Sequence, residues 1–113
     1  MSRDYRLYLE DILEAAQKIE NYTEGLSFQQ FIQDEMRLDA VLRNLEIIGE
    51  ATKNLPSELR DKYPAVDWRK VAGLRDIVIH AYFNIDNNII WDIVQNKLPD
   101  LQSYVATILE QEA

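Results

Sequence analysis

Apolar residues recur at three- and four-residue spacing along most of the chain, which is the periodicity of amphipathic helices. The first such stripe runs from Arg3 to about Tyr22, and Ser2 in front of it is a plausible N-cap. No segment shows the strict apolar and polar alternation of a half-buried strand, and no internal repeat is visible. The pattern therefore predicts an all-α fold, an antiparallel bundle of four to five helices.

The second stripe predicts the longest helix of the chain. The segment "TEGLS" at 23–27 interrupts the first stripe, and Ser27 can cap a helix that continues to about Leu55. Pro56 stops this helix, which would be on the order of 40 Å long at about 1.5 Å per residue. The following stretch "PSELRDKYP", 56–64, reads as one or two helical turns between prolines.

This long helix carries two apolar stripes, whereas a single bundle core requires only one. Either the helix is central and surrounded by its own neighbours, or one stripe is the seam of a homodimer. In the second case, a charge placed at Leu45 or Ile48 should disrupt association. The near-heptad stripe consists of Phe31, Leu38, Val41, Leu45, Ile48, Thr52 and Leu55, and the other stripe of Ile32, Met36, Ala40 and Ile47.

The second half of the chain is also helical in pattern. Asp67 can cap a helix from Trp68 to about Phe83, and a final helical stretch begins at Asp86. Pro99 lies inside that stretch and lacks a backbone donor, so we expect a kink or a restart of the helix near residue 96.

Composition adds limits on class and location. A chain of 113 residues fits one domain, 1–113, and 47% hydrophobic with 28% charged residues is the balance of a soluble globular protein. The absence of cysteine excludes disulfides, thiolate metal sites and a cysteine nucleophile. The N-terminus lacks the apolar core of a signal peptide, and no apolar run reaches membrane-spanning length, so we expect a cytoplasmic protein without membrane contact.

The net charge of −8 argues against a simple nucleic-acid coat, because phosphate binding relies on a basic surface. The charge is unevenly distributed, however. Residues 37–75 hold eight of the 12 basic side chains against six acids. This uneven distribution allows a local basic zone on an acidic body.

The segment "LRDIVIHAYFNID", 74–86, contains the only histidine, His80, five residues after Arg75. On an ideal helix, residues five apart are separated by about 140°. Arg75 and His80 could therefore not hold one small group together within a continuous helix. Either the helix ends near His80, or a second subunit completes the site.

Two further polar residues accompany this pair. Asp76 lies four residues before His80, so its carboxylate could accept a hydrogen bond from the imidazole and orient it. Tyr82 lies two turns beyond Arg75 on nearly the same stripe. A purely structural interpretation remains open, in which His80 ends a helix, Arg75 pairs with an acid and Tyr82 packs with its hydroxyl at the surface.

The chemistry that suits this cluster is RNA cleavage without a metal. One group removes the ribose 2′-OH proton, another protonates the leaving oxygen, and a guanidinium stabilises the phosphorane. Because one histidine cannot easily be both acid and base, the single His80 favours a dimer. The chain has no glycine-rich phosphate loop, paired metal-ligand histidines or serine elbow. Glu46 and Glu50 could bind a metal, but an ordinary solvated helix face is the simpler interpretation.

The residues of this segment also carry a family resemblance. "RDIVIHAY" fits the Arg-x4-His-x-Tyr pattern of the HEPN superfamily toxins of the HepT type. "RNLEIIGEATKNLP" at 43–56 resembles the long second helix of that family, and "YPAVDWRKVAGLRDIVIHAYFNID" through "IIWDIVQNKLPDL" is similar to its second half. The similarity covers roughly residues 5–110.

The resemblance implies a dimeric, metal-independent endoribonuclease without cofactor, in which Arg75 and His80 of both subunits line a cleft and Asp76 supports them. It also implies a toxin of a type VII-like toxin–antitoxin pair. The partner would be a nucleotidyltransferase antitoxin of the MntA type, which inactivates the toxin by transferring AMP from ATP to Tyr82. Anionic phosphates beside Arg75 and His80 would occupy the cation and block the cleft.

Three hypotheses follow. The first is the ribonuclease toxin. The second is a non-catalytic helical dimer that binds a nucleotidyltransferase and nucleotide through the same Arg75 and His80. The third is a structural bundle in which the cluster is only a helix terminus.

Overall fold

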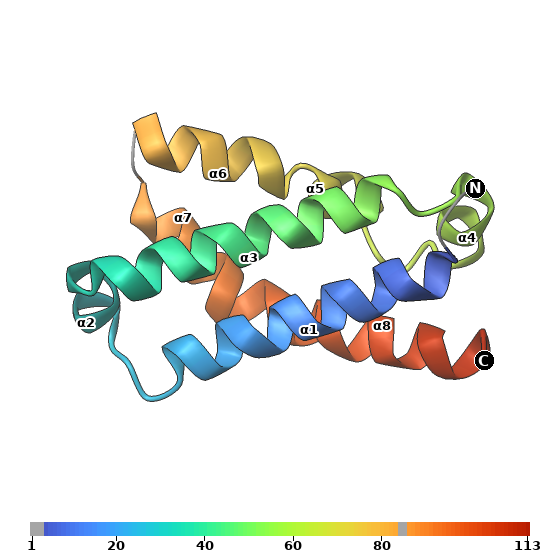
Figure 1. The fold of residues 1–113 in the computed structure, drawn as a ribbon, viewed down its shortest axis with the longest axis horizontal. Helices are drawn as coiled ribbons and strands as arrows, with labels where there is room; N and C mark the ends of the chain where they lie inside the picture. Colours follow the sequence, from blue (N-terminus) through green and yellow to red (C-terminus); the bar gives the residue numbers. More distant parts are fainter. Residues whose placement is uncertain (1–3, 84–85) are drawn as a thin grey trace.

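A computed structural model describes residues 4–83 and 86–113, which form helices and no strand. The all-α fold class is thus confirmed. Figure 1 shows the arrangement of the helices in a bundle about 40 Å long. In chain order they are α1 (Tyr5–Thr23), α2 (Phe28–Gln33), α3 (Glu35–Lys53), α4 (Ser57–Lys62), α5 (Trp68–Ala72), α6 (Leu74–Phe83), α7 (Asn87–Asp92), a π-helical segment (Ile93–Lys97) and α8 (Leu98–Gln111).

Helices α1 and α3 form the antiparallel centre of the bundle. Helix α8 packs on α1, while α5 and α6 pack on α3 (Figure 1). In the described part of the chain, the helices enclose one hydrophobic cluster of buried residues, to which α1, α3, α6 and α8 contribute several members each and α2, α4, α5 and α7 one each. Its completely buried side chains include Leu9, Ile12, Ile19, Phe31, Val41, Leu45, Ile48, Ile90 and Val105.

Most of the predicted helix starts are confirmed by side-chain caps. Ser27 accepts a hydrogen bond from Gln30 N while the Gln30 side chain accepts one from Ser27 N, a complete capping box. Asp67 and Asp86 also cap the helices that follow them. At α1 the prediction was wrong in its residue: the cap is Asp4, and Ser2 lies outside the described residues.

The prediction of one long helix from Ser27 to Leu55 is wrong, because the helix is interrupted at Asp34. Its backbone, at φ −96° and ψ 88°, is not helical. Its carboxylate accepts a hydrogen bond from Arg37 N at 3.1 Å and pairs with Arg37 Nε at 2.9 Å. Asp34 therefore ends α2 and caps α3. The helical spacing of apolar residues continues across this interruption, which is why the sequence did not reveal it.

The predicted helix from Trp68 to Phe83 is likewise divided, at Gly73. The Gly73 N–H is shared between the carbonyls of Arg69 and Val71, which closes α5 in a tight turn. The Asp76 and Ile77 N–H groups then bond to Gly73 O and start α6. The break turns the chain at the point where α6, the helix that carries Arg75 and His80, begins.

The expected irregularity near Pro99 is confirmed. Residues 93–97 form a π-helical segment, and α8 starts at Leu98 with Pro99 in its first turn. A proline in the first turn does not sacrifice a helical hydrogen bond, since those N–H groups have no partner within the helix.

The near-heptad stripe of α3 belongs to the core of the single chain. Leu45 and Ile48 are both 0% exposed. The interpretation of this stripe as a homodimer seam is therefore wrong, and a charge at either position would disrupt folding. In the second stripe, Ile32 and Ile47 are partly buried against the same core, whereas Met36 is 83% exposed.

One polar cluster joins three distant segments at an end of the bundle. Tyr5 Oη donates to Glu112 Oε1 at 2.9 Å, while Tyr63 Oη and Lys62 Nζ reach Oε2 at 2.6 and 2.7 Å. These donors, with Lys62 the strongest, then Tyr63 and Tyr5, lower the pKa of the Glu112 carboxyl to about 2. The beginning of α1, the end of α4 and the end of α8 are thereby held together (Figure 1).

Within the described residues, none of the helices combines the length and apolar character needed to cross a lipid bilayer.

Candidate active site

Helix α6 carries the four residues of the predicted cluster. It begins at Leu74 and continues through His80 to Phe83. His80 therefore lies in the last turn of the helix, as one of the two alternatives expected, but the chain is helical from Arg75 through His80, so the helix end does not bring these two residues together. Leu74, Val78 and Ala81 are buried, while Asp76, Ile79 and His80 are exposed, so one face of α6 is directed to solvent.

Arg75 lies on the flank of α6 that faces α3. Its Nη1 donates to Glu50 Oε2 at 2.7 Å, and the two side chains are 38% and 55% exposed. Arg75 and Glu50 line a polar hollow of about 390 Å³ between α1, α3 and α6, together with Arg43, Glu46 and Asn54. The guanidinium is therefore tethered to α3 yet still open to solvent.

Gly49 brings α6 unusually close to α3 at this point. A Cβ at Gly49 would lie 3.1 Å from both the backbone N and the Cγ of Arg75, and 3.2 Å from Ala72 O. A glycine inside a helix destabilises a protein by roughly 0.5–1 kcal/mol relative to alanine. The close approach of α6 explains why a glycine nevertheless occupies this position of α3. The stem of Arg75 thus rests on Gly49 and its guanidinium on Glu50.

His80 lies on a different flank of α6. It lines a hollow of about 120 Å³ with Ile77, Ala81 and Asp86, closed by Ile89 and Ile90 of α7. None of these residues lines the hollow around Arg75. The single chain therefore does not bring Arg75 and His80 together.

The expected support of His80 by Asp76 is not formed. Both side chains are exposed, and among the described residues no hydrogen bond or ion pair joins them. Asp86, which lines the hollow of His80, instead accepts a hydrogen bond from Asn88 N at 3.1 Å. The backbone of Tyr82 belongs to α6, but its side chain lies outside the described part of the structure. The expectation that its hydroxyl is exposed therefore stays a prediction.

The carboxylate pair on α3 forms ion pairs. Glu46 pairs with Arg43 at 3.7 Å, and Glu50 with Arg75 at 2.7 Å. Across residues 4–83 and 86–113, no group of three or more potential ligands is placed to hold a metal ion. Glu46 and Glu50 thus belong to an ion-paired helix face, and the sequence did not reveal Arg75 as the partner of Glu50.

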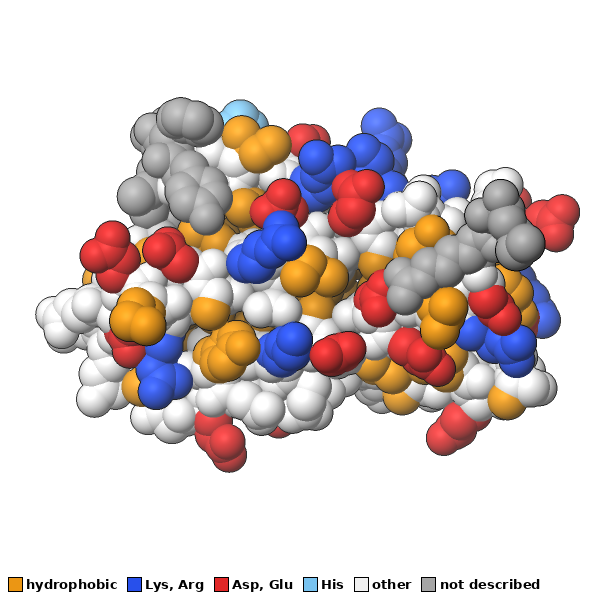
Figure 2. Space-filling view, viewed as in Figure 1, with side chains coloured by type: hydrophobic (Ala, Val, Ile, Leu, Met, Phe, Trp, Pro, Cys, Tyr) orange, Lys and Arg blue, Asp and Glu red, His pale blue; other side chains and the backbone are white. Residues whose placement is uncertain are grey.

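Half of the basic side chains of residues 37–75 form ion pairs with acids. Besides Arg43 with Glu46 and Arg75 with Glu50, Arg37 pairs with Asp34, and Lys62 with Glu112. Figure 2 shows acidic and basic side chains interspersed over the face formed by α1, α3 and α6. An uninterrupted basic surface is absent from this face.

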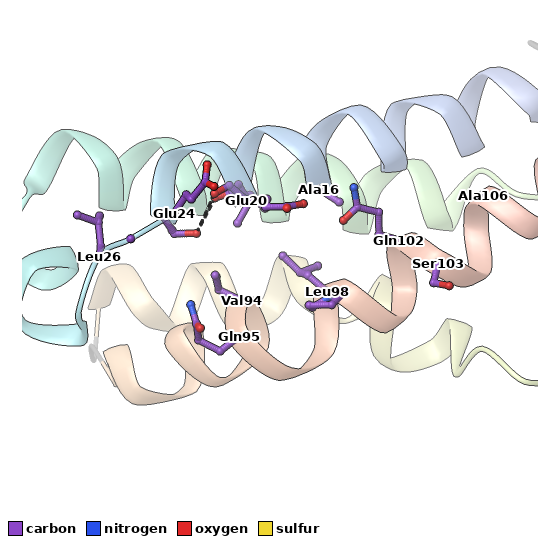
Figure 3. Close-up of a pocket in the computed structure, with 14 residues that line it drawn as sticks. Ala16, Glu20, Glu24, Leu26, Val94, Gln95, Leu98, Gln102, Ser103 and Ala106 are labelled. Carbon is purple, nitrogen blue, oxygen red and sulfur yellow. Dashed lines mark hydrogen bonds between the residues drawn. The ribbon is translucent and has the colours of Figure 1, made fainter.

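Two larger grooves, each about 580 Å³, lack the predicted residues. Figure 3 shows the groove between α1 and the chain around the start of α8, where Glu20 and Gln102 come from opposite walls. Its lining contains carboxylates, amides and hydroxyls but no lysine, arginine or histidine. The other groove, between α5, α6 and α8, is mainly apolar. The second groove includes lysines and carboxylates, but neither groove contains an arginine or a histidine.

The exposed groups on α6 thus have the right chemistry but not the right geometry within one chain. An exposed imidazole can accept or donate a proton, and a guanidinium can bind phosphate oxygens through two parallel hydrogen bonds. A second copy of α6 would be needed to place a cation near each imidazole.

Comparison with known proteins agrees with this chemistry. Residues 12–108 match the family described as "Ribonuclease HepT-like". A Methanocaldococcus jannaschii protein named as a "Putative RNase" is 49% identical over 98 residues, which cover 87% of this chain and 81% of that protein. One from Caldanaerobacter subterraneus, also named "Putative RNase", is 43% identical over 107 residues, covering 95% and 96%. The "Probable ribonuclease HepT" of Thermococcus cleftensis is 43% identical over 102 residues, covering 90% and 93%.

No solved structure is significantly similar to this chain.

Proposed function

Because the chain belongs to the ribonuclease HepT-like family, we propose that it is a metal-independent endoribonuclease toxin whose active site forms between two copies of α6. Arg75 and His80 of both copies are the proposed catalytic residues. The observation that carries the proposal is their placement: both side chains reach solvent from one helix, yet they line separate hollows. Two chains related by a two-fold axis supply what one chain cannot.

Each residue has a role that follows from its chemistry. One His80 imidazole removes the 2′-OH proton and the other, protonated, donates to the leaving 5′ oxygen, so that a 2′,3′-cyclic phosphate forms. Arg75 stabilises the negative charge of the phosphorane. Its pairing with Glu50 uses one of the five guanidinium N–H donors and leaves the others for phosphate. Ile79, 49% exposed on the outward face of α6, supplies apolar surface for contact with the second copy.

We expect the purified chain to cleave RNA in the presence of EDTA. Arg75→Ala and His80→Ala should each lower the rate by about 10²–10⁴-fold, the usual contribution of a positioned proton-transfer or charge-stabilising group. Arg69→Ala, an exposed arginine on α5, is the matched control and should cleave normally. Cleavage by His80→Ala at the wild-type rate would refute the assignment.

The shared site can be tested by mixing. When wild-type chains are mixed with an excess of His80→Ala chains, the mixed dimers contain two copies of Arg75 but only one imidazole. Because the proposed mechanism uses both imidazoles, we expect the excess variant to suppress cleavage by the wild-type chains to an extent that depends on the mixing ratio. Unchanged cleavage, with mixed dimers detected by differential tagging, would indicate that each chain uses its own Arg75 and His80.

We further propose that the chain acts within a type VII-like toxin–antitoxin pair, with an MntA-type nucleotidyltransferase that modifies Tyr82. The phenol oxygen would attack the α-phosphate of ATP, a phosphodiester would form, and pyrophosphate would leave. The added phosphate would lie on the same helix as Arg75 and compete with RNA for it. With such a partner and ATP, mass spectrometry should show AMP on the wild type and none on Tyr82→Phe. Modification at another residue would contradict the assignment.

A non-catalytic binding module is the second candidate, and the charge distribution favours it. Half of the basic side chains of residues 37–75 are engaged in internal ion pairs, and the whole chain carries −8, which weakens attraction for RNA. This candidate predicts a stable complex with the nucleotidyltransferase but no RNA cleavage by the dimer at any practical concentration.

A further inference from the structure

We propose that Glu50 is a positioning residue for Arg75, an inference that rests on the ribonuclease function proposed above. The hydrogen bond from Arg75 Nη1 to Glu50 Oε2, 2.7 Å long, joins α6 to α3 across 25 residues of sequence. Glu50 would not contact RNA itself. It would fix the direction from which the guanidinium approaches the phosphate.

The geometry around Glu50 supports a fixed position rather than an occasional contact. Gly49, the residue before it, provides the flat helix surface on which the Arg75 stem lies, since any Cβ there would be 3.1 Å from Arg75 Cγ. Consecutive residues of α3 thus hold the two ends of one side chain. An arginine without these contacts would sample many rotamers, and ordering it on RNA binding would cost entropy.

The pair also decides which flank of α6 carries the positive charge. Asp76, Ile79 and His80 occupy the exposed face, whereas Glu50 draws the guanidinium toward α3. In a two-chain site, the distance from Arg75 to the partner's imidazole would depend on this orientation. A displacement of about 1 Å at a reacting centre can cost about 10²-fold in rate.

Two other roles for Glu50 predict different results. A stabilising ion pair is the first, but both side chains are more than a third exposed, and such pairs contribute little to folding. The second is a mask that competes with RNA for Arg75. A mask requires only a negative charge and no packing surface for the aliphatic part of the arginine side chain. The close packing of Arg75 on Gly49 therefore favours the positioning role of Glu50.

The test compares Glu50→Ala, Glu50→Gln and the control Glu14→Ala in the purified dimer. Glu14 is an exposed acid of α1 that pairs with Lys18 at 3.4 Å and does not line the hollow around Arg75. We expect Glu50→Ala to lower kcat about 10²-fold with little change in KM or melting temperature. Glu50→Gln, which keeps an acceptor oxygen, should recover part of kcat, and Glu14→Ala should match the wild type.

A double variant completes the test. If Glu50 acts only through Arg75, adding Glu50→Ala to Arg75→Ala should cause no further loss of kcat, whereas independent roles would give multiplicative losses. A wild-type kcat in Glu50→Ala, or faster cleavage with tighter RNA binding, would overturn the positioning role and, in the latter case, identify a mask. A wild-type chain that cleaves no RNA would instead refute the proposed function.

Discussion

At the scale of single residues, Gly49 shows how one missing methyl group shapes the site. Replacement of a glycine inside a helix by alanine normally stabilises a protein. Here the added Cβ would meet two backbone atoms of the turn between α5 and α6, Arg75 N and Ala72 O, at 3.1 and 3.2 Å. Backbone atoms of a packed turn cannot rotate away as the end of a flexible side chain can.

We therefore expect Gly49→Ala to lower the free energy of unfolding by about 1–3 kcal/mol, the usual cost of overpacking. RNA cleavage should fall by more than stability explains, because the turn that positions Arg75 must shift. Urea denaturation measures the first quantity and single-turnover cleavage the second. An alanine variant more stable than the wild type would mean that α6 moves away without strain.

The sequence identified Arg75, Asp76, His80 and Tyr82 but not their surroundings. Glu50 was recognised only as part of a carboxylate pair with Glu46, four residues away on the same helix. Its actual partner is 25 residues distant, and nothing in local spacing links the two. The predicted contact of Asp76 with His80 shows the converse, since correct helical spacing permits a hydrogen bond but does not form it.

At the scale of helices, caps were predictable and breaks were not. Ser27, Asp67 and Asp86 each follow an obvious interruption and precede an apolar run, so their role could be read locally. Asp34 and Gly73 lie inside continuous apolar periodicity, which a short break does not disturb. Whether the chain bends there depends on the packing of flanking helices.

The stability that the Asp34 cap contributes at the interruption between α2 and α3 can be measured directly. Asp34→Ala removes the side-chain acceptor for Arg37 N, and we expect a loss of about 1 kcal/mol in unfolding free energy, typical of an N-cap. Asp39→Ala, an exposed acid within α3, is the control and should have a much smaller effect. An Asp34→Ala variant as stable as the control would indicate that α2 and α3 join into one helix without cost.

At the scale of the whole molecule, the Glu112 cluster joins segments from both ends of the described chain. The apolar pattern gave no sign of it, because it depends on three donors brought together from α1 and the end of α4 only by the complete fold. The all-helical class followed from periodicity alone, whereas such closure contacts require the tertiary structure.

This cluster predicts a specific acid response. The folded-state pKa of Glu112, about 2, lies below its ordinary value of 4.5, so its stabilising effect is complete above the ordinary pKa and is lost as pH falls toward 2. Glu112→Gln should therefore melt at a lower temperature than the wild type at pH 7, and the difference should shrink between about pH 4.5 and 2.

Glu110→Gln, an exposed neighbour on α8, provides the control and should follow the wild type throughout. A difference between Glu112→Gln and the wild type that stays constant down to the lowest pH would show that the three donors stabilise the neutral carboxyl equally well.

Because Arg75 and His80 face different flanks of one helix, the proposed two-chain site would make RNA cleavage depend on the concentration of the chain in the cell. If two copies of the chain are needed for each site, as proposed, the active fraction depends on dimer formation. Below the dissociation constant, doubling the synthesis of the chain would raise RNA cleavage about fourfold by mass action. At low levels of synthesis most chains would then be inactive monomers, whereas a large increase in synthesis would raise RNA cleavage more than proportionally.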